Sequence, residues 1–122
     1  MGWGMQRNLK AERRQLLNAV NAGDTLDDLE QWALPLIDRG SISSSDQKTL
    51  PEAVAAFPGL SPTPIRDNQH RLIGIMLWCG GADNHYGLVI GSGHDPPPCW
   101  PIRKRLSDHI WLYDEVPGLD GR

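Results

Sequence analysis

The side chains best suited to acid–base chemistry lie in the segment GSGHDPPPCWP, residues 91 to 101, and shortly after it. Within this segment His94 stands beside Asp95, between two glycines that permit tight turns and three prolines that stiffen the chain. A rigidly held imidazole beside a carboxylate can act as a general acid or base. We therefore take His94 as the candidate acid or base, Asp95 as the group that orients it, and His109 as a second titrating residue.

The same region offers donor atoms that zinc accepts, from His94, Asp95, Cys99 and His109. Their spacing matches no recognised ligand pattern, and adjacent His-Asp pairs are common in ordinary turns. The sequence therefore predicts no metal and no cofactor, and a structural loop is the alternative to a catalytic one. Cys79 and Cys99 are expected at opposite ends of a sheet, too far apart for a disulfide.

Two further loop motifs give no recognised active site. Gly91-Ser92-Gly93 follows an apolar run as a phosphate loop does, but prolines stand where a helix N-terminus should begin, and the serine lies in no G-x-S-x-G elbow. GGADNH, residues 80 to 85, most simply connects two strands of a hairpin. The length of one strand separates it from His94, so the two loops are not expected to form one site.

Charge and hydropathy argue against several classes of partner. The chain carries 12 basic and 15 acidic side chains, a net charge of −3 spread evenly along it. Trp100 with Arg103, Lys104 and Arg105 could contact single-stranded nucleic acid, but nearby acidic residues offset that charge, which favours a solvated edge strand. The longest apolar run, residues 72 to 79, is too short to span a membrane, and the N-terminus lacks the apolar centre of a signal peptide. A cytoplasmic protein is expected.

Helical spacing of apolar residues covers two segments of the first half, residues 9 to 20 and 24 to 40, each closed by a glycine. Pro35 lies inside the second segment and predicts a kink or an early end near residues 31 to 34.

The connection to the second half is expected to be mostly irregular. SISSSDQ is typical of a polar loop, and Thr49 with Glu52 fits a capping box that would open a short helix through Ala56. The prolines that follow break regular structure, leaving a hairpin arm only at Ile65 and Arg66.

Three runs rich in Ile, Val, Leu, Trp and Tyr follow, at residues 70 to 79, 86 to 90 and 109 to 113. The loops between them are too short for a crossover helix, so the runs predict an antiparallel sheet. A chain of 122 residues matches one domain. The predicted fold is a single α+β domain over residues 1 to 122, with two to three N-terminal helices packed on one face of a three- to five-stranded antiparallel sheet formed by the C-terminal half.

Alternation along the strands separates two kinds of side chain. The aliphatic set around Ile75 and Leu77 is the natural core against the helices. The other face collects larger side chains that could bind a partner: Met76, Trp78, Trp111 and Tyr113, with Tyr86 joining them if the register allows, and Trp100 in the bordering loop. Three interpretations stay open for this aromatic face: burial under the Trp3 or Trp100 segment, pairing in a homodimer, or a groove for a ligand or partner protein.

No motif identifies a reaction. The preferred hypothesis is a small soluble interaction or binding module, which uses the aromatic face and the 91 to 101 loop to bind a partner protein or a second copy of itself. The alternative is a small enzyme or small-molecule binder with an acid–base site at His94, Asp95 and His109. A concave site around His94 lined by apolar groups would favour the alternative, and a flat, exposed aromatic surface would favour protein recognition.

Overall fold

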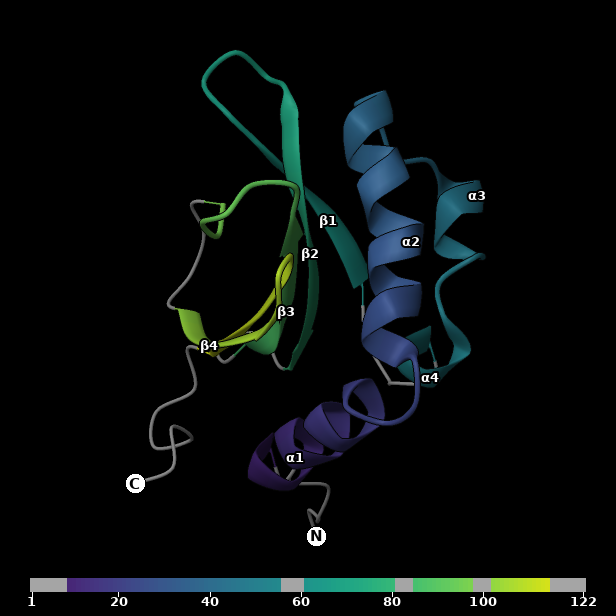
Figure 1. The fold of residues 1–122 in the computed structure, drawn as a ribbon, viewed down its shortest axis with the longest axis vertical. Helices are drawn as coiled ribbons and strands as arrows, with labels where there is room; N and C mark the ends of the chain where they lie inside the picture. Colours follow the sequence, from purple (N-terminus) through teal and green to yellow (C-terminus); the bar gives the residue numbers. More distant parts are fainter. Residues whose placement is uncertain (1–8, 56–60, 81–84, 98–101, 115–122) are drawn as a thin grey trace, which may run out of the picture.

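The computed structural model describes residues 9–55, 61–80, 85–97 and 102–114 (Figure 1). Four helices come first in these ranges: α1 (Leu9–Val20), α2 (Thr25–Arg39), α3 (Ser44–Gln47) and α4 (Glu52–Ala55). Five strands follow: β1 (Ser61–Arg66), β2 (Leu72–Gly80), β3 (His85–Gly91), β4 (Ile102–Ser107) and β5 (Ile110–Asp114). The predicted α+β arrangement is confirmed, with one helix more than expected.

Helix α2 does not end early near Pro35, so the early end, one of the two predicted effects of this proline, is wrong. The helix continues to Arg39, where Gly40 in the left-handed conformation (φ 90°) donates its N–H to the carbonyls of Leu36 and Ile37. Pro35 and Gln31 are both exposed. Water can therefore satisfy the Gln31 carbonyl that the proline leaves without a helical partner, and the buried stripe of α2 stays intact.

The segment predicted as a polar loop contains α3, which is a second correction. The capping box here is formed by Ser43 and Asp46, with the Ser43 N–H donating to Asp46 Oδ2 (2.7 Å). The predicted capping hydroxyl of Thr49 instead donates to the Asp46 carbonyl (2.8 Å). The Ser43 backbone N–H, followed by the Arg39 side chain, lowers the pKa of the Asp46 carboxyl below its usual value.

The strands form one antiparallel sheet in the order β1-β2-β3-β5-β4. Strand β1 is longer than the predicted arm because it begins at Ser61 and includes Pro62 and Pro64. Proline is tolerated there because β1 is an edge strand, where one row of N–H groups has no strand to pair with. The other edge is β4, which confirms the prediction that the basic segment forms an edge strand.

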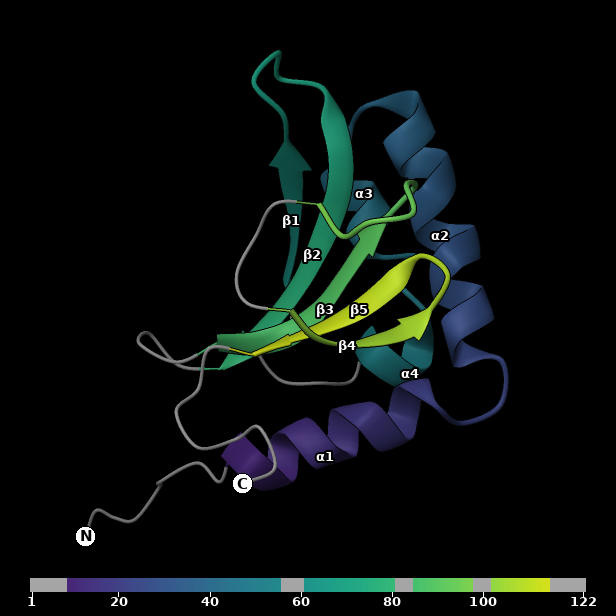
Figure 2. The same ribbon diagram turned by 60° about the vertical axis from the view of Figure 1, so that its left-hand side comes forward.

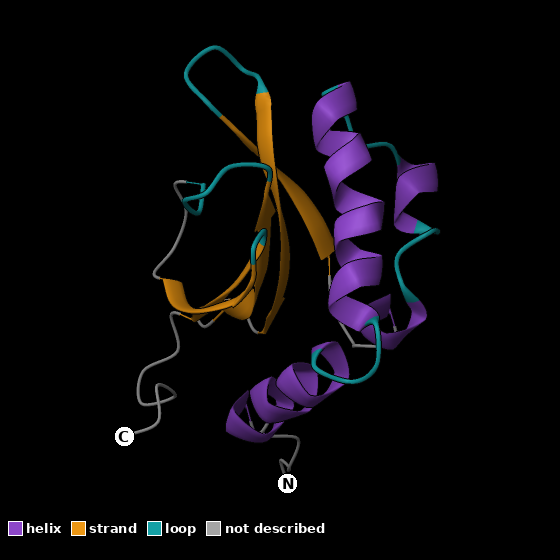
Figure 3. Ribbon diagram, in the orientation of Figure 1, coloured by secondary structure: helices purple, strands orange, loops and turns teal. Residues whose placement is uncertain are grey.

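The helices cover one face of the curved sheet (Figures 1 and 3). As predicted, Ile75 and Leu77 point to this side and are fully buried against residues such as Leu29 and Ala33 of α2. Tyr86 also belongs to this helix-facing core, which corrects its expected place on the aromatic face. The reason is the register: Leu88 pairs with Leu77, so Tyr86, two residues earlier on β3, shares their face.

The other face holds a second, smaller apolar cluster. Its buried members are Met76, Val89, Trp111 and Tyr113, with Ile65 and Ile102 packed beside them. Figure 2 shows the segment after β3 crossing this side of the sheet, away from the helices. Pro97 of that segment is buried and lies on Gly74 and Gly91, which pair with each other across β2 and β3.

Within the described ranges no helix has both the length and the apolar character to cross a bilayer. The longest, α2, has 15 residues, whereas a spanning helix needs about 20.

Candidate functional site: a cleft between two histidines

The histidine cleft lies where β3 ends and β5 begins, and its volume is about 300 Å³. Five residues line it: Ser92, Gly93, His94, Asp108 and His109. The antiparallel pairing of Ile90 with Ile110 brings these two segments to the same end of the sheet. The structure thus places His94 and His109 together, as the sequence predicts, although 14 residues of chain separate them.

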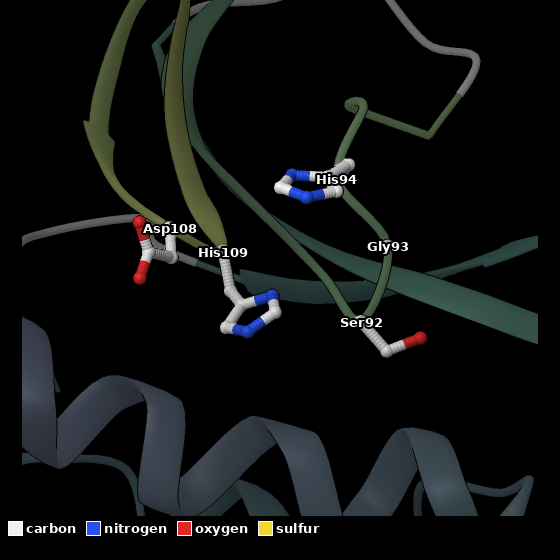
Figure 4. A pocket seen from close by; sticks show the side chains of 5 residues that line it. All are labelled: Ser92, Gly93, His94, Asp108 and His109. Atoms are coloured by element: carbon white, nitrogen blue, oxygen red, sulfur yellow. The ribbon is translucent and has the colours of Figure 1, made fainter.

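The two imidazole rings occupy the space between the segments (Figure 4). In the same view the Asp108 carboxylate and the Ser92 hydroxyl point away from that space, and α2 runs alongside the cleft. His94 is exposed and His109 is half-buried. A ligand entering the cleft would therefore meet imidazole groups first.

His109 is held in one tautomer by the backbone of Gly91. Its Nδ1 lies 3.0 Å from the Gly91 carbonyl oxygen. A carbonyl oxygen can only accept, so Nδ1 must carry the proton. The neutral ring then has its lone pair on Nε2, where it can accept a hydrogen bond or a proton. The Gly91 N–H also donates to the His109 carbonyl (3.0 Å), so two hydrogen bonds join these residues.

Arg105 connects the two walls of the cleft. Its Nη2 donates to the His94 carbonyl, and its Nη1 donates to the Asp108 carbonyl (3.0 Å). The guanidinium carbon lies 5.1 Å from the centroid of the Trp111 ring, within the range of a cation–π contact. One side chain of β4 therefore sets the separation of the walls and rests on the second apolar cluster at the same time.

A long-range hydrogen bond ties the cleft to α2. The Ser107 hydroxyl donates to Glu30 Oε2 (2.6 Å), across 77 residues of sequence. Ser107 Oγ in turn accepts a long hydrogen bond from the His109 N–H (3.4 Å). The β4–β5 turn that carries Asp108 and His109 is thus fixed to the helix layer.

The proposed partnership of Asp95 with His94 has no support in the geometry. Asp95 is exposed, does not line the cleft, and makes no side-chain hydrogen bond with His94 among the described residues. The orienting group that the structure does show is the Gly91 carbonyl, which acts on His109. Backbone groups leave no sequence signal, which is why this contact was missed.

The described part of the chain also contains no group of three or more His, Cys, Asp or Glu side chains that could hold a metal ion. Cys99 and the side chain of Cys79 lie outside the described residues, as do Trp100 and the side chain of Trp78.

Three of the residues expected to bind a partner through the aromatic face are buried within the chain itself. Met76 is 5 %, Trp111 2 % and Tyr113 0 % exposed. They pack with Val89 under Ile65 and Ile102, so this part of the face is buried. Trp3 and Trp100, whose segments were expected to cover it, lie outside the described residues.

The sequence did not single out Gly93, Asp108 or Arg105 as site residues. Arg105 had a signal in the sequence, as a cation next to the apolar run that contains Trp111, but its partners depend on how two turns pack.

The concave shape around His94 agrees with a small-ligand site. Its lining is polar and glycine-rich, however, and not apolar as that hypothesis required. Comparisons of the chain with protein-family models, with curated proteins and with solved structures gave no match.

Proposed function

We propose that this protein is a small binding module that takes a hydrogen-bonding group of its ligand into the histidine cleft. The observation that carries the proposal is the convergence of His94 and His109, from two separate segments, on one cleft with both walls held in place. Arg105 holds the walls together, and the Gly91 carbonyl fixes the ring of His109. A prearranged site loses little conformational entropy when it binds, which favours recognition.

The burial of Met76, Trp111 and Tyr113 moves the proposed working surface from the aromatic face to this cleft. A partner that used those three side chains would first have to open an apolar cluster. The cleft, in contrast, is open to solvent and about 300 Å³ in volume, at the lower end of the range for small-ligand sites. Its occupant is therefore a small molecule or one side chain of a partner protein.

An acid–base enzyme is the second candidate, and one observation favours it. The Gly91 carbonyl leaves the lone pair of neutral His109 on Nε2, as a general base requires. In this alternative His109 is the base and His94 the second titrating group, while Asp95 has no assigned role.

Binding is tested by NMR on protein with isotope-labelled histidine, at about pH 8, where an unperturbed imidazole is neutral. The probes are acetamide, acetate, phosphate, methylguanidinium and butylammonium, each added to about 10 mM to detect Kd values in the millimolar range. We expect at least one probe to shift the imidazole signals of His94 and His109 together. His70, on the exposed turn between β1 and β2, is the internal control and should not respond.

Two variants separate cleft binding from unspecific effects. His109→Phe keeps a planar ring but removes both nitrogens, and should abolish the response of His94. His70→Asn is the matched control, because asparagine tolerates the positive φ of 64° at this position. The proposal fails if no probe moves the His94 and His109 signals, or if His109→Phe responds like the wild type.

A further inference from the structure

The histidine cleft has few free hydrogen-bond donors among its described side chains, and the exposed imidazole of His94 supplies one ring N–H when it is neutral. The Nδ1–H of His109 is used by the Gly91 carbonyl, so its free ring nitrogen in the neutral form is an acceptor. The guanidinium of Arg105, which reaches both walls of the cleft, already donates to the carbonyls of His94 and Asp108 and rests on Trp111. The Ser92 hydroxyl points away from the space between the rings (Figure 4).

Three carboxylates belong to the lining of the cleft or to residues that lie next to its lining or bond to its neighbours. Asp108 belongs to its lining, although its carboxylate points away from the space between the rings (Figure 4), and Asp95 follows His94 directly without lining the cleft. Glu30 of α2 accepts the hydrogen bond of Ser107, the residue before Asp108, and α2 runs alongside the cleft. Among the described residues in and next to the cleft, three carboxylates outnumber one arginine whose donors are already in use, and a concave site with this charge balance attracts cations.

We infer that the histidine cleft binds a protonated amine or a guanidinium group, which donates to His109 Nε2 and is attracted by Glu30 and Asp108. This inference rests on the proposed binding function and names its ligand class. An anion is disfavoured because it would meet the lone pair of His109 and the negative charge of three nearby carboxylates, with little beyond the ring N–H of His94 to donate to it. The cation is either a free small molecule or the side chain of a lysine or arginine in a partner protein.

The test ranks the charged probes at equal ionic strength. Methylguanidinium and butylammonium should shift the His94 and His109 signals in a saturable manner, whereas acetate and phosphate at the same concentration should not. Glu30→Gln and Asp108→Asn keep the shape of each side chain and remove its charge, so each should raise the Kd of methylguanidinium about threefold. The matched control is Asp28→Asn, an exposed carboxylate on the opposite side of α2 from Glu30, which should leave the Kd unchanged.

The outcomes distinguish the ligand class from the function itself. If acetate or phosphate binds and the cations do not, the cleft still binds ligands but the inferred class is wrong. If no probe binds, both proposals fail. A peptide with one arginine between glycines identifies the source of the cation: tighter binding than methylguanidinium supports a partner side chain, and equal binding supports a free small molecule.

Discussion

The ring of Pro97 lies directly on Gly74, and no side chain fits between them. A Cβ atom built on Gly74 would lie 2.6 Å from Cγ of Pro97 and 2.9 Å from the carbonyl oxygen of Ile90. The paired residue Gly91 is covered in the same way, with Pro97 Cγ at 2.8 Å from its Cβ position. The loop that leaves the sheet at Gly91 therefore returns to it at Pro97, and His94 lies in the middle of this closed loop.

Replacing Gly74 with alanine should destabilise the protein. The added methyl group meets a backbone oxygen and a buried ring, neither of which can move freely, so we expect the free energy of unfolding to fall by about 1 to 3 kcal/mol. Urea unfolding measures this loss. Gly93→Ala is the matched control, because its nearest contact would be an ordinary 3.9 Å from the Asp95 carbonyl oxygen. Equal stability of the Gly74 and Gly93 variants would contradict the close packing of Pro97.

The hydrogen bond from Ser107 to Glu30 should contribute to stability as a coupled pair. A double-mutant cycle with Ser107→Ala and Glu30→Ala should give a coupling energy of about 0.5 to 1.5 kcal/mol, the usual range for a partly buried hydrogen bond. A second cycle that pairs Ser107→Ala with Asp28→Ala serves as the control and should give no coupling. A zero value in the first cycle would mean that the tie between α2 and the β4–β5 turn has no energetic role.

Arg105→Ala should disturb both walls of the histidine cleft at once. It removes two hydrogen bonds to backbone carbonyls and the contact with Trp111, so we expect a loss of about 1 to 2 kcal/mol in unfolding free energy. The imidazole signals of His94 and His109 should both shift. Lys104→Ala, a change of the exposed neighbouring cation, should alter neither quantity.

Arg105→Lys restores the charge over Trp111 but not the forked geometry that reaches two carbonyls. It should therefore recover part of the stability while the two imidazole signals stay shifted. If Arg105→Ala leaves both signals in place, Arg105 does not position the cleft.

The carboxyl of Asp46 should make stability depend on pH in the acid range. Its pKa is lowered in the folded chain, mainly by the Ser43 N–H and then by Arg39, so the stabilisation is present above the ordinary pKa of an unfolded aspartate, about 3.9. As the pH falls further, Asp46 is protonated first in the unfolded chain. The stabilisation therefore decreases until the pH lies below the lower pKa that Asp46 has in the folded state.

Asp46→Asn removes this titration, so the stability difference between wild type and variant should be largest at neutral pH and should shrink below about pH 4. Urea unfolding from about pH 7 to about pH 2 measures it. A difference that does not change with pH would show that the charge of Asp46 is not what stabilises the start of α3.

Features with a local cause were predictable from the sequence. Alternation along β2 separates Ile75 and Leu77 from Met76, because successive side chains of a strand point to opposite faces whatever the neighbouring strands do. Gly40 ends α2 because a left-handed residue closes a helix at little cost only when it is glycine. Local rules failed where the surroundings lower the free-energy cost of a proline in regular structure. Pro35 is exposed in α2, and Pro62 lies in the edge strand β1.

By itself, then, the sequence determined the α+β class and the alternation of side chains along each strand, because hydrophobic period depends on the chain alone. It predicted the meeting of His94 with His109 only on the condition that the last strand pairs with residues 86 to 90, and the tertiary structure decided that pairing, which skips β4. Tertiary structure decided the rest. The strand register placed Tyr86 with the helices, and Pro97 packed on the paired glycines Gly74 and Gly91. Arg105 and the Gly91 carbonyl became the groups that hold the cleft. The distances between the residues in these contacts are set by the packing of whole helices and strands, and the spacing of residues along the sequence does not predict that packing.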